Sequence, residues 1–185
     1  SSGSCGVELN ATHLFWTDRD GRVGRASLDG SSQIDNLVSA NNEPCGVAVD
    51  STHLYYADIG DGTIGRANID GSPSDDGFIN NAGTGVCDVE VNDTHIYWAN
   101  RITGTIGRAN IDGTGSNPDF ITGLGQPCGV ALDAEPEPPE TTITAKPHKR
   151  TRKRSARFEF ASDEPASTFE CSVDRAEFTA CSSPH

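Results

Sequence analysis

Three copies of one sequence motif follow each other along the chain at an interval of about 40 residues. They begin at Cys5, Cys45 and Cys87, and a fourth copy opens at Cys128 with the letters CGVALD. The spacings between successive cysteines are 40, 42 and 41 residues. A chain with such a period builds one small structural unit per repeat, and each unit buries its apolar face only against its neighbours. The repeat therefore constrains the fold more than any other property of the sequence.

Each copy contains four short apolar stretches that are separated by turn residues. In the second copy they lie at residues 47–49, 54–57 and 63–69, with a weaker one around 78–79. Runs of β-branched and aromatic residues between Asp-Gly and Asx turns are typical of strands and hairpins. Since no segment has a sustained 3.6-residue apolar period, we expect no helix. Four antiparallel strands per repeat of this length predict an all-β fold, a partial β-propeller of three four-stranded blades.

Two segments of the repeat resemble the low-density-lipoprotein-receptor class B, or YWTD, family. The first is LFWTD at residues 14–18, LYYAD at 54–58 and IYWAN at 96–100; the second is IGRANIDG, which occurs twice. The third copy departs from the YWTD box because Asn100 replaces its Asp. The resemblance covers roughly residues 5–133 and implies blades of a six-bladed propeller, but it carries over no binding residue.

The fourth copy stops after residues 127–133, which we expect to form a single strand of a fourth blade. A lone strand at this point is consistent with a blade whose other three strands are supplied by sequence upstream of Ser1. A six-bladed propeller would also need two further complete blades. We therefore expect the remaining blades to come from upstream sequence.

Composition favours an extracellular or cell-envelope protein. The chain has 27 acidic and 14 basic residues, a formal net charge of −13, and 20 glycines but no methionine. Such acidity argues against nucleic-acid binding. No run approaches the roughly 18 apolar residues that a membrane-spanning helix needs, so we expect no membrane insertion. The sequence indicates no cofactor.

A second region follows a stiff Pro/Glu linker at residues 134–140. Alternating apolar residues at 156–160 and 168–173 indicate strands with one buried face. The segment SDEPASTFECSVD resembles bacterial Ig-like modules, which implies an incomplete Ig-like β-sandwich at residues 141–185. Cys171 and Cys181 flank an expected hairpin turn at 174–177, so we predict a disulfide between them, consistent with an oxidising compartment.

The four repeat cysteines allow three interpretations: small buried side chains, disulfides between blades, or metal ligands. A disulfide requires Cα atoms within about 4.4–6.8 Å of each other, and the innermost strands of neighbouring blades are expected to lie farther apart. We therefore favour small buried side chains. His13, His53 and His95 also recur at one position of each blade, about a blade apart, so we expect a structural role and no metal site.

Three other repeated or clustered features have structural interpretations. One arginine recurs at the same position of each blade, as Arg25, Arg66 and Arg108. We expect these arginines to form bridges between blades, with the box carboxylates Asp18 or Asp58 as partners. The sequons at Asn10 and Asn92 occupy the position of Asp50, where an Asx turn explains them without a glycan. Seven of the fourteen basic residues lie at 146–157, most simply as a solvated loop and strand edge.

Differences between the copies indicate where a ligand could bind. By strand order, the loops between the second and third strands share one propeller face with the connections between blades, and the other turns share the opposite face. The second face is nearly uniform between copies, whereas the first varies. Because loops on rigid scaffolds carry function, we predict binding residues on the varied face: Arg19, Asp20, Asp61, Arg101 and Thr103.

Three classes of function follow from this reading. We favour a non-catalytic extracellular recognition module, a propeller scaffold with an Ig-like spacer, whose partner is a protein or a glycan. The alternatives are a secreted propeller enzyme of the lactonase or lyase kind, or a purely structural stalk. Enzymes need unequal acidic, amide or His side chains that converge on the channel, whereas the histidines here recur identically, which favours recognition.

Overall fold

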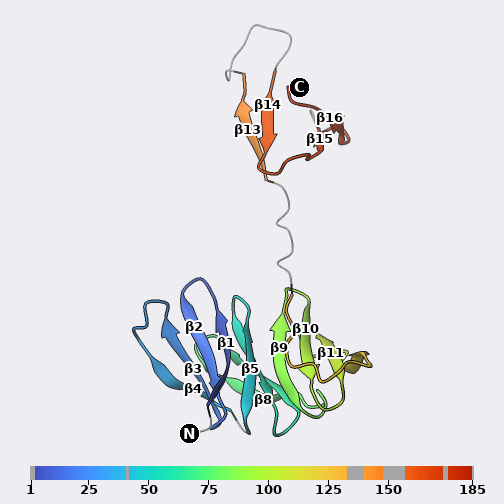
Figure 1. Ribbon diagram of the computed structural model, residues 1–185. Coiled ribbons are helices and arrows are strands. Elements are labelled where there is room, and N and C mark those ends of the chain that lie inside the picture. Colours follow the sequence, from blue (N-terminus) through green and yellow to red (C-terminus); the bar gives the residue numbers. More distant parts are fainter. Residues whose placement is uncertain (1–2, 41, 133–139, 148–156, 173–174, 185) are drawn as a thin grey trace. The chain divides into compact units, whose positions relative to one another are not determined.

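The computed structural model describes residues 3–40, 42–132, 140–147, 157–172 and 175–184. The chain divides into two compact units, Ser1–Asp133 and Ala134–His185. Both are built from strands (Figure 1). Within the described residues there is no helix, and hence none that could cross a membrane.

The first unit consists of three four-stranded antiparallel sheets, one for each complete repeat, as the sequence predicts. We call these sheets blades 1, 2 and 3. The strands of blade 1 are β1 (Ser4–Leu9), β2 (His13–Asp18), β3 (Arg22–Ser27) and β4 (Ile34–Ser39). Those of blade 2 are β5 (Pro44–Val49), β6 (His53–Asp58), β7 (Thr63–Asn68) and β8 (Ser74–Ile79). Those of blade 3 are β9 (Val86–Val91), β10 (His95–Asn100), β11 (Thr105–Asn110) and β12 (Asn117–Ile121).

The opening of the fourth repeat, residues 127–132, forms no strand in this structure. It is nevertheless attached to β9, because Cys128 is disulfide-bonded to Cys87 and the Val130 amide donates to Asp88 Oδ2 at 3.0 Å. In blades 1 to 3 the corresponding segment is a strand because it pairs with the second strand of its own blade. The segment therefore has the position of a strand without the pairing that would make it one.

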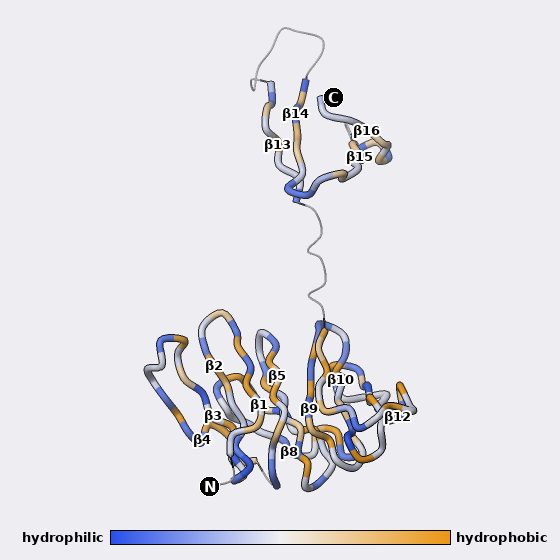
Figure 2. The backbone as a smooth tube through the Cα atoms, viewed as in Figure 1, coloured by the Kyte–Doolittle hydropathy of each residue, from blue (hydrophilic) through white to orange (hydrophobic). Residues whose placement is uncertain are grey.

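The apolar core lies between blades, and Figure 2 shows apolar residues recurring along the strands of each blade. One cluster joins Phe15, Val23 and Val38 of blade 1 to Val47, Leu54 and Tyr56 of blade 2. A second cluster joins Tyr55, Ile64 and Ile79 of blade 2 to Val89, Ile96 and Trp98 of blade 3. Blade 2 thus has a forward side, which packs on blade 3, and a backward side, which packs on blade 1. The corresponding backward side of blade 1 and forward side of blade 3 are not covered by another blade in this structure, and we call them open sides.

The aromatic residue of each YWTD-like box lies across a glycine of the next strand. Cross-strand pairing sets Trp16 opposite Gly24, and it sets Trp98 opposite Gly107. A Cβ added at either glycine would lie less than 3.0 Å from the indole ring. The same holds for Gly65, which is opposite Tyr56 in blade 2. The glycine of the IGRAN segment is therefore required by the aromatic residue of the box.

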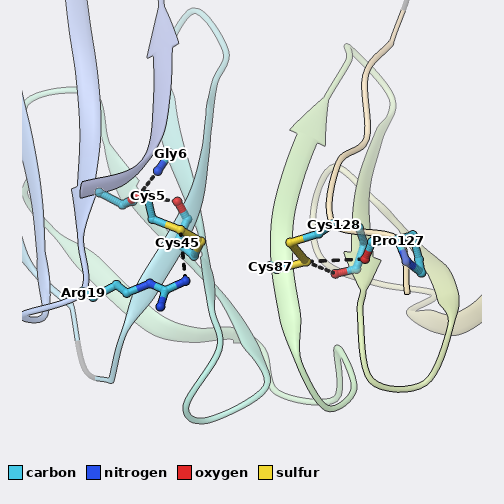
Figure 3. Close-up of a disulfide and its surroundings, with 9 residues drawn as sticks. Cys5, Gly6, Arg19, Cys45, Cys87, Pro127 and Cys128 are labelled. Atoms are coloured by element: carbon cyan, nitrogen blue, oxygen red, sulfur yellow. Dashed lines mark hydrogen bonds between the residues drawn. A yellow bond between two sulfur atoms is a disulfide. The ribbon is translucent and has the colours of Figure 1, made fainter. Parts of the chain in front are cut away.

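The repeat cysteines form disulfides between neighbouring repeats, so the expectation of unpaired, buried side chains was wrong. Cys5 and Cys45 join β1 to β5 with a Cα–Cα distance of 4.8 Å, and Cys87 and Cys128 lie 5.4 Å apart (Figure 3). For the first pair the physical reason is the glycine after Cys5. A Cβ at Gly6 would collide with the Cys45 carbonyl oxygen, so only glycine permits this approach. The second pair forms without a glycine on β9, because Cys87 is followed by Asp88, whose carboxylate accepts from the Val130 amide.

Thr17 supports the first of these contacts. Its hydroxyl accepts a hydrogen bond from the Gly6 amide at 2.9 Å and donates to the Cys45 carbonyl oxygen. Thr17 is fully buried and stands where the second and third copies have Ala57 and Ala99. The departure from the repeat therefore has a local structural explanation.

The described residues of the second unit form two two-stranded antiparallel sheets. The first pairs β13 (Thr141–Ala145) with β14 (Glu159–Ser162), and the second pairs β15 (Phe169–Cys171) with β16 (Thr179–Cys181). The Cys171–Cys181 disulfide expected from the sequence is present, with a Cα–Cα distance of 5.8 Å. The two cysteines are diagonal neighbours, because Cys171 lies opposite Thr179. The predicted linker, apart from Glu140, and most of the basic segment lie outside the described residues.

Candidate functional site

Hydrogen bonds between loops assign the turns to two propeller faces in the way the sequence predicts. On the first face, the amides of Ile59 and Gly60 in the β6–β7 loop donate to Glu43 and Asn42 in the connection that leads into blade 2. On the second face, the Ile69 amide after β7 donates to the Thr52 carbonyl in the β5–β6 turn. We call these the varied face and the uniform face.

The last residue of each YWTD-like box holds the loops of the varied face in place. In blade 2 the Asp58 carboxylate accepts from the amides of Asn42 at 2.8 Å, Gly60 at 3.0 Å and Asp61 at 3.3 Å. Burial raises the pKa of Asp58 above its usual range, although these amide donors oppose the shift. In blade 3 the Asn100 amide nitrogen donates instead to the Ala82 carbonyl at 2.9 Å. Asp58 and Asn100 therefore both bind the connection that leads into their own blade, Asp58 as a hydrogen-bond acceptor and Asn100 as a donor.

The five predicted binding residues all lie on the varied face and are exposed: Arg19, Asp20, Asp61, Arg101 and Thr103. The Arg19 guanidinium lies 3.7 Å from Cys5 Sγ, beside the first disulfide (Figure 3). Asp20 lies 3.3 Å from the guanidinium of Arg22. Asp61 accepts from the Asn42 side-chain amide at 3.0 Å, and the Thr103 hydroxyl lies 3.0 Å from that of Thr105.

Two further residues of this face were not among the predicted binding residues. Asn42 lies in the connection before blade 2 and bridges Asp58 and Asp61. Ile102, at the tip of the β10–β11 loop, is 65% exposed and lies over Gly85. Asn42 lies in a connection outside the recurring motif, so comparison of the copies could not identify it. Ile102 lies in the loop that the sequence reading assigned to the varied face, but it was not chosen as a binding residue.

The repeated arginines do not bridge to the box carboxylates, which corrects that expectation. Asp18 pairs instead with Arg22 at 2.8 Å. Arg25 donates to the Ile69 carbonyl of blade 2 at 3.0 Å, so it does join two blades. The guanidinium of Arg66 lies 3.8 Å from the centre of the Phe78 ring, a cation–π contact within one blade, and Arg108 lies 4.2 Å above Phe120 in the same way.

The uniform face is built from identical Asx turns, as predicted. In blade 1 the Asn10 Oδ1 atom accepts from the amides of Thr12 and His13 at 2.9 and 2.8 Å, and Asp50 and Asn92 repeat the pattern. Each histidine shares one hydrogen bond with the hydroxyl of the preceding threonine. In blade 1 the Thr12 hydroxyl lies 2.7 Å from His13 Nδ1. The histidines thus contribute to the turns, and within the described residues no group of three or more His, Cys, Asp or Glu side chains could hold a metal ion.

A cavity opens on the uniform face at the seam between blades 2 and 3. Its volume is about 340 Å³, and its lining combines apolar Val49, Val91 and Ile111 with the polar turn residues Asp50 and Asn92. Burial opposes ionisation of Asp50, but hydrogen bonds from Thr52, His53 and Tyr55 hold its pKa below the usual range. The carboxylate is therefore charged but already saturated with donors from the protein.

No family model matches this sequence, and no curated protein matches it. Among solved structures, a chain of the nidogen/laminin complex matches with a TM-score of 0.55 and 22% identity, over 62% of this chain and 46% of that chain. The streptogramin B lyase structure matches with a TM-score of 0.52 and 16% identity, over 98% of this chain and 55% of the lyase chain. The computationally designed Ika4 protein matches with a TM-score of 0.57 and 10% identity, over 88% of this chain and 87% of Ika4.

These similarities establish the fold. The chain is all-β, and its three four-stranded sheets resemble propeller blades of a binding protein and of a lyase alike. It spans about half the length of the nidogen-complex and lyase chains that it matches. The three disulfides indicate an oxidising, extracellular environment.

Proposed function

We propose that the chain is a non-catalytic extracellular recognition module of YWTD type that binds a protein or glycan through its varied face. The observation that carries this proposal is the way Asp58 fixes the β6–β7 loop. Three amides from that loop and from the preceding connection converge on one carboxylate, so the exposed Asp61 side chain is held on a rigid support. A rigid loop loses little conformational entropy when a ligand binds.

The chemistry of the face fits a polar partner surface. Arg19 and Arg101 supply positive charge, Asp20 and Asp61 supply negative charge, and Thr103 supplies a hydroxyl, all on loops that differ between blades. Mixed charges of this kind favour specificity and fast association with a complementary protein surface. The similarity to a chain of the nidogen/laminin complex makes a protein partner the first one to test.

The second unit contributes to the proposal as a spacer. Residues 141–185 would form an incomplete Ig-like module in this role. The Cys171–Cys181 disulfide and the two strand pairs support a small covalently closed β unit, which suits such a role in an oxidising environment.

A binding screen tests the proposed function. The full chain is titrated with purified laminin, as a representative matrix protein, and applied to a glycan array. For each probe that binds, Asp61→Ala/Arg101→Ala should weaken affinity at least about tenfold, whereas Asp70→Ala in a turn of the uniform face should leave it unchanged. A loss that follows Asp70→Ala and not the double variant would place recognition on the uniform face, where the cavity between blades 2 and 3 lies.

Catalysis is the rival function, and the similarity to streptogramin B lyase motivates testing it. An enzyme of this fold would need unequal polar side chains that converge on a substrate. One such departure from the repeat is Asp88, which stands where the other copies have glycine. Turnover of a lactone or a cyclic depsipeptide that disappears in Asp88→Asn would overturn the recognition proposal.

A further inference from the structure

Two of the three equivalent Asx turns on the uniform face are also N-glycosylation sequons. Residues 10–12 and 92–94 have the pattern Asn-x-Thr, whereas the same turn of blade 2 begins with Asp50. An N-linked glycan requires a secreted chain and an accessible surface loop. The second sequon meets both conditions, since the three disulfides indicate an oxidising, extracellular environment and both Asp93 and Thr94 are exposed.

The Asx turn uses only one of the two polar atoms of the Asn92 side chain. Its Oδ1 atom accepts from the Thr94 amide at 3.0 Å, from the Thr94 hydroxyl at 3.1 Å and from the His95 amide at 2.8 Å. The Nδ2 atom, to which a glycan is attached, makes no hydrogen bond to a residue in the described part of the chain. The turn and a glycan are therefore compatible, because they use different atoms.

Blade 2 shows the same turn with its second polar atom already occupied. The Oδ2 atom of Asp50 accepts from the Tyr55 hydroxyl at 2.9 Å, while Oδ1 accepts from the turn. Tyr97 stands at the position of Tyr55 in blade 3, but no hydrogen bond joins it to Asn92, and the structure describes both residues. The blade that carries the sequon thus leaves free the side-chain position that blade 2 uses internally.

Asn92 also lines the cavity of about 340 Å³ between blades 2 and 3. The other lining residues supply apolar walls, two hydroxyl groups and a carboxylate: Val49, Val91, Ile111, Ser51, Thr52 and Asp93. A pyranose ring has the matching chemistry, because its C–H face is apolar and its hydroxyl groups both donate and accept hydrogen bonds. The volume lies within the range of sites that hold small molecules.

We propose that Asn92 is the acceptor of an N-linked glycan whose first sugar lies in this cavity and bridges the turns of blades 2 and 3. Attachment joins Asn92 Nδ2 to the anomeric carbon of a lipid-diphosphate-linked oligosaccharide. The bond from that carbon to the diphosphate oxygen breaks, the diphosphate leaves with the electron pair, and Nδ2 gives up one proton. This inference is independent of the proposed recognition function, since a glycan here covers the uniform face and leaves the varied face free.

The first experiment measures occupancy of the site. The full chain is secreted from yeast, which attaches oligomannose glycans, with Thr12→Val removing the other sequon while the amides of the turn still donate to Asn10. Peptide mapping by mass spectrometry should find a glycan on Asn92 in most molecules. A matched chain that also carries Thr94→Val keeps Asn92 but loses the sequon, and it should carry no glycan. A folded, secreted chain with unmodified Asn92 would overturn the proposal.

The second experiment locates the first sugar. An endoglycosidase that cuts within the core of the glycan leaves one N-acetylglucosamine on Asn92, whereas a peptide N-glycosidase removes it and converts Asn92 to Asp. Blade 2 has Asp in the same turn, so the turn should persist in both products. Hydrogen exchange at residues 49–52 and 91–94 should be at least about threefold slower in the product that retains one sugar.

An Asn92→Asp variant from the same host is the matched control and should exchange like the fully deglycosylated product. Equal exchange in the two enzymatic products would show that the sugar extends into solvent and would overturn its placement in the cavity. Protection limited to residues 91–94 would also count against the proposal, because the sugar would then contact blade 3 alone.

Discussion

Replacing Gly107 by Ala tests whether the box aromatic and the IGRAN glycine form one packing unit. Gly107 lies opposite Trp98, and a Cβ there would lie less than 3.0 Å from three atoms of the indole ring. The ring cannot move aside easily, because Trp98 is fully buried and its Nε1 donates to the Ala82 carbonyl at 2.6 Å. Overpacking of this kind costs about 1–3 kcal/mol.

Two effects of the substitution oppose each other, so the net magnitude is worked out from both. Ala restricts the unfolded chain and thereby stabilises the folded state by about 0.4–1 kcal/mol. Gly107→Ala should therefore lower the free energy of unfolding by about 1–2 kcal/mol. Gly24→Ala provides the matched control, because its partner Trp16 is only half-buried, on the open side of blade 1, and can swing outward. We expect a loss below about 0.5 kcal/mol there.

Urea unfolding followed by far-ultraviolet circular dichroism measures both changes. The slope of the free energy of unfolding against urea concentration should stay unchanged, which shows that only stability has altered. Gly125→Ala, where nothing lies within 4 Å of the added Cβ, should be neutral or slightly stabilising. In a Trp98→Leu background, adding Gly107→Ala should cost less than it does in the parent, since the clashing ring is gone. Equal losses at Gly107 and Gly24 would refute the reasoning, as would a double variant whose losses simply add.

Three further outcomes follow from the structure. Replacing Cys5 and Cys45 together by Ser should lower the free energy of unfolding by about 4 kcal/mol, the loop-entropy value for the 40-residue separation, and a loss below about 1 kcal/mol in urea titrations would contradict it. Burial raises the pKa of Asp88, so the folded state binds its proton more readily than the unfolded state. The free energy of unfolding should therefore fall as the pH rises through that pKa. Asp88→Asn should be more stable than the parent at pH 7, and its thermal midpoint should depend less on pH. Trp98→Ala should cost about 3–5 kcal/mol and Trp16→Ala clearly less, because only the first ring is fully covered; similar costs would contradict the open side of blade 1.

The periodicity of the sequence was sufficient to predict the blades and their two faces. The stretches around 54–57 and 63–69 became β6 and β7, and the Asp-Gly and Asx segments became the turns between strands. These features are local, since each depends on residues within one repeat. For the same reason the Asx turn at Asn10 could be read from Asp50.

The contacts between repeats could not be predicted, because equal spacing reveals which residues are equivalent and not how closely they approach. The cysteine pairs are the clearest case. The glycine at position 6 was visible, but its role as the point where two backbones nearly touch depends on how closely blades 1 and 2 approach each other. The predicted partner of the arginines was wrong for a different reason. Arg66 lies opposite Tyr55, three residues along β6 from Asp58, and this distance of about 10 Å of strand separates it from the Asp58 carboxylate.

The alternation of the interblade disulfides determines how the propeller unit would respond to a pulling force. One disulfide closes the segment from Cys5 to Cys45 and the other closes the segment from Cys87 to Cys128. Under tension in an oxidising medium, only the segment between Cys45 and Cys87 could lengthen, by about 3.3–3.6 Å for each residue released. Reduction would roughly triple the extensible length between Cys5 and Cys128, so the oxidised unit would yield in one short step centred on blade 2.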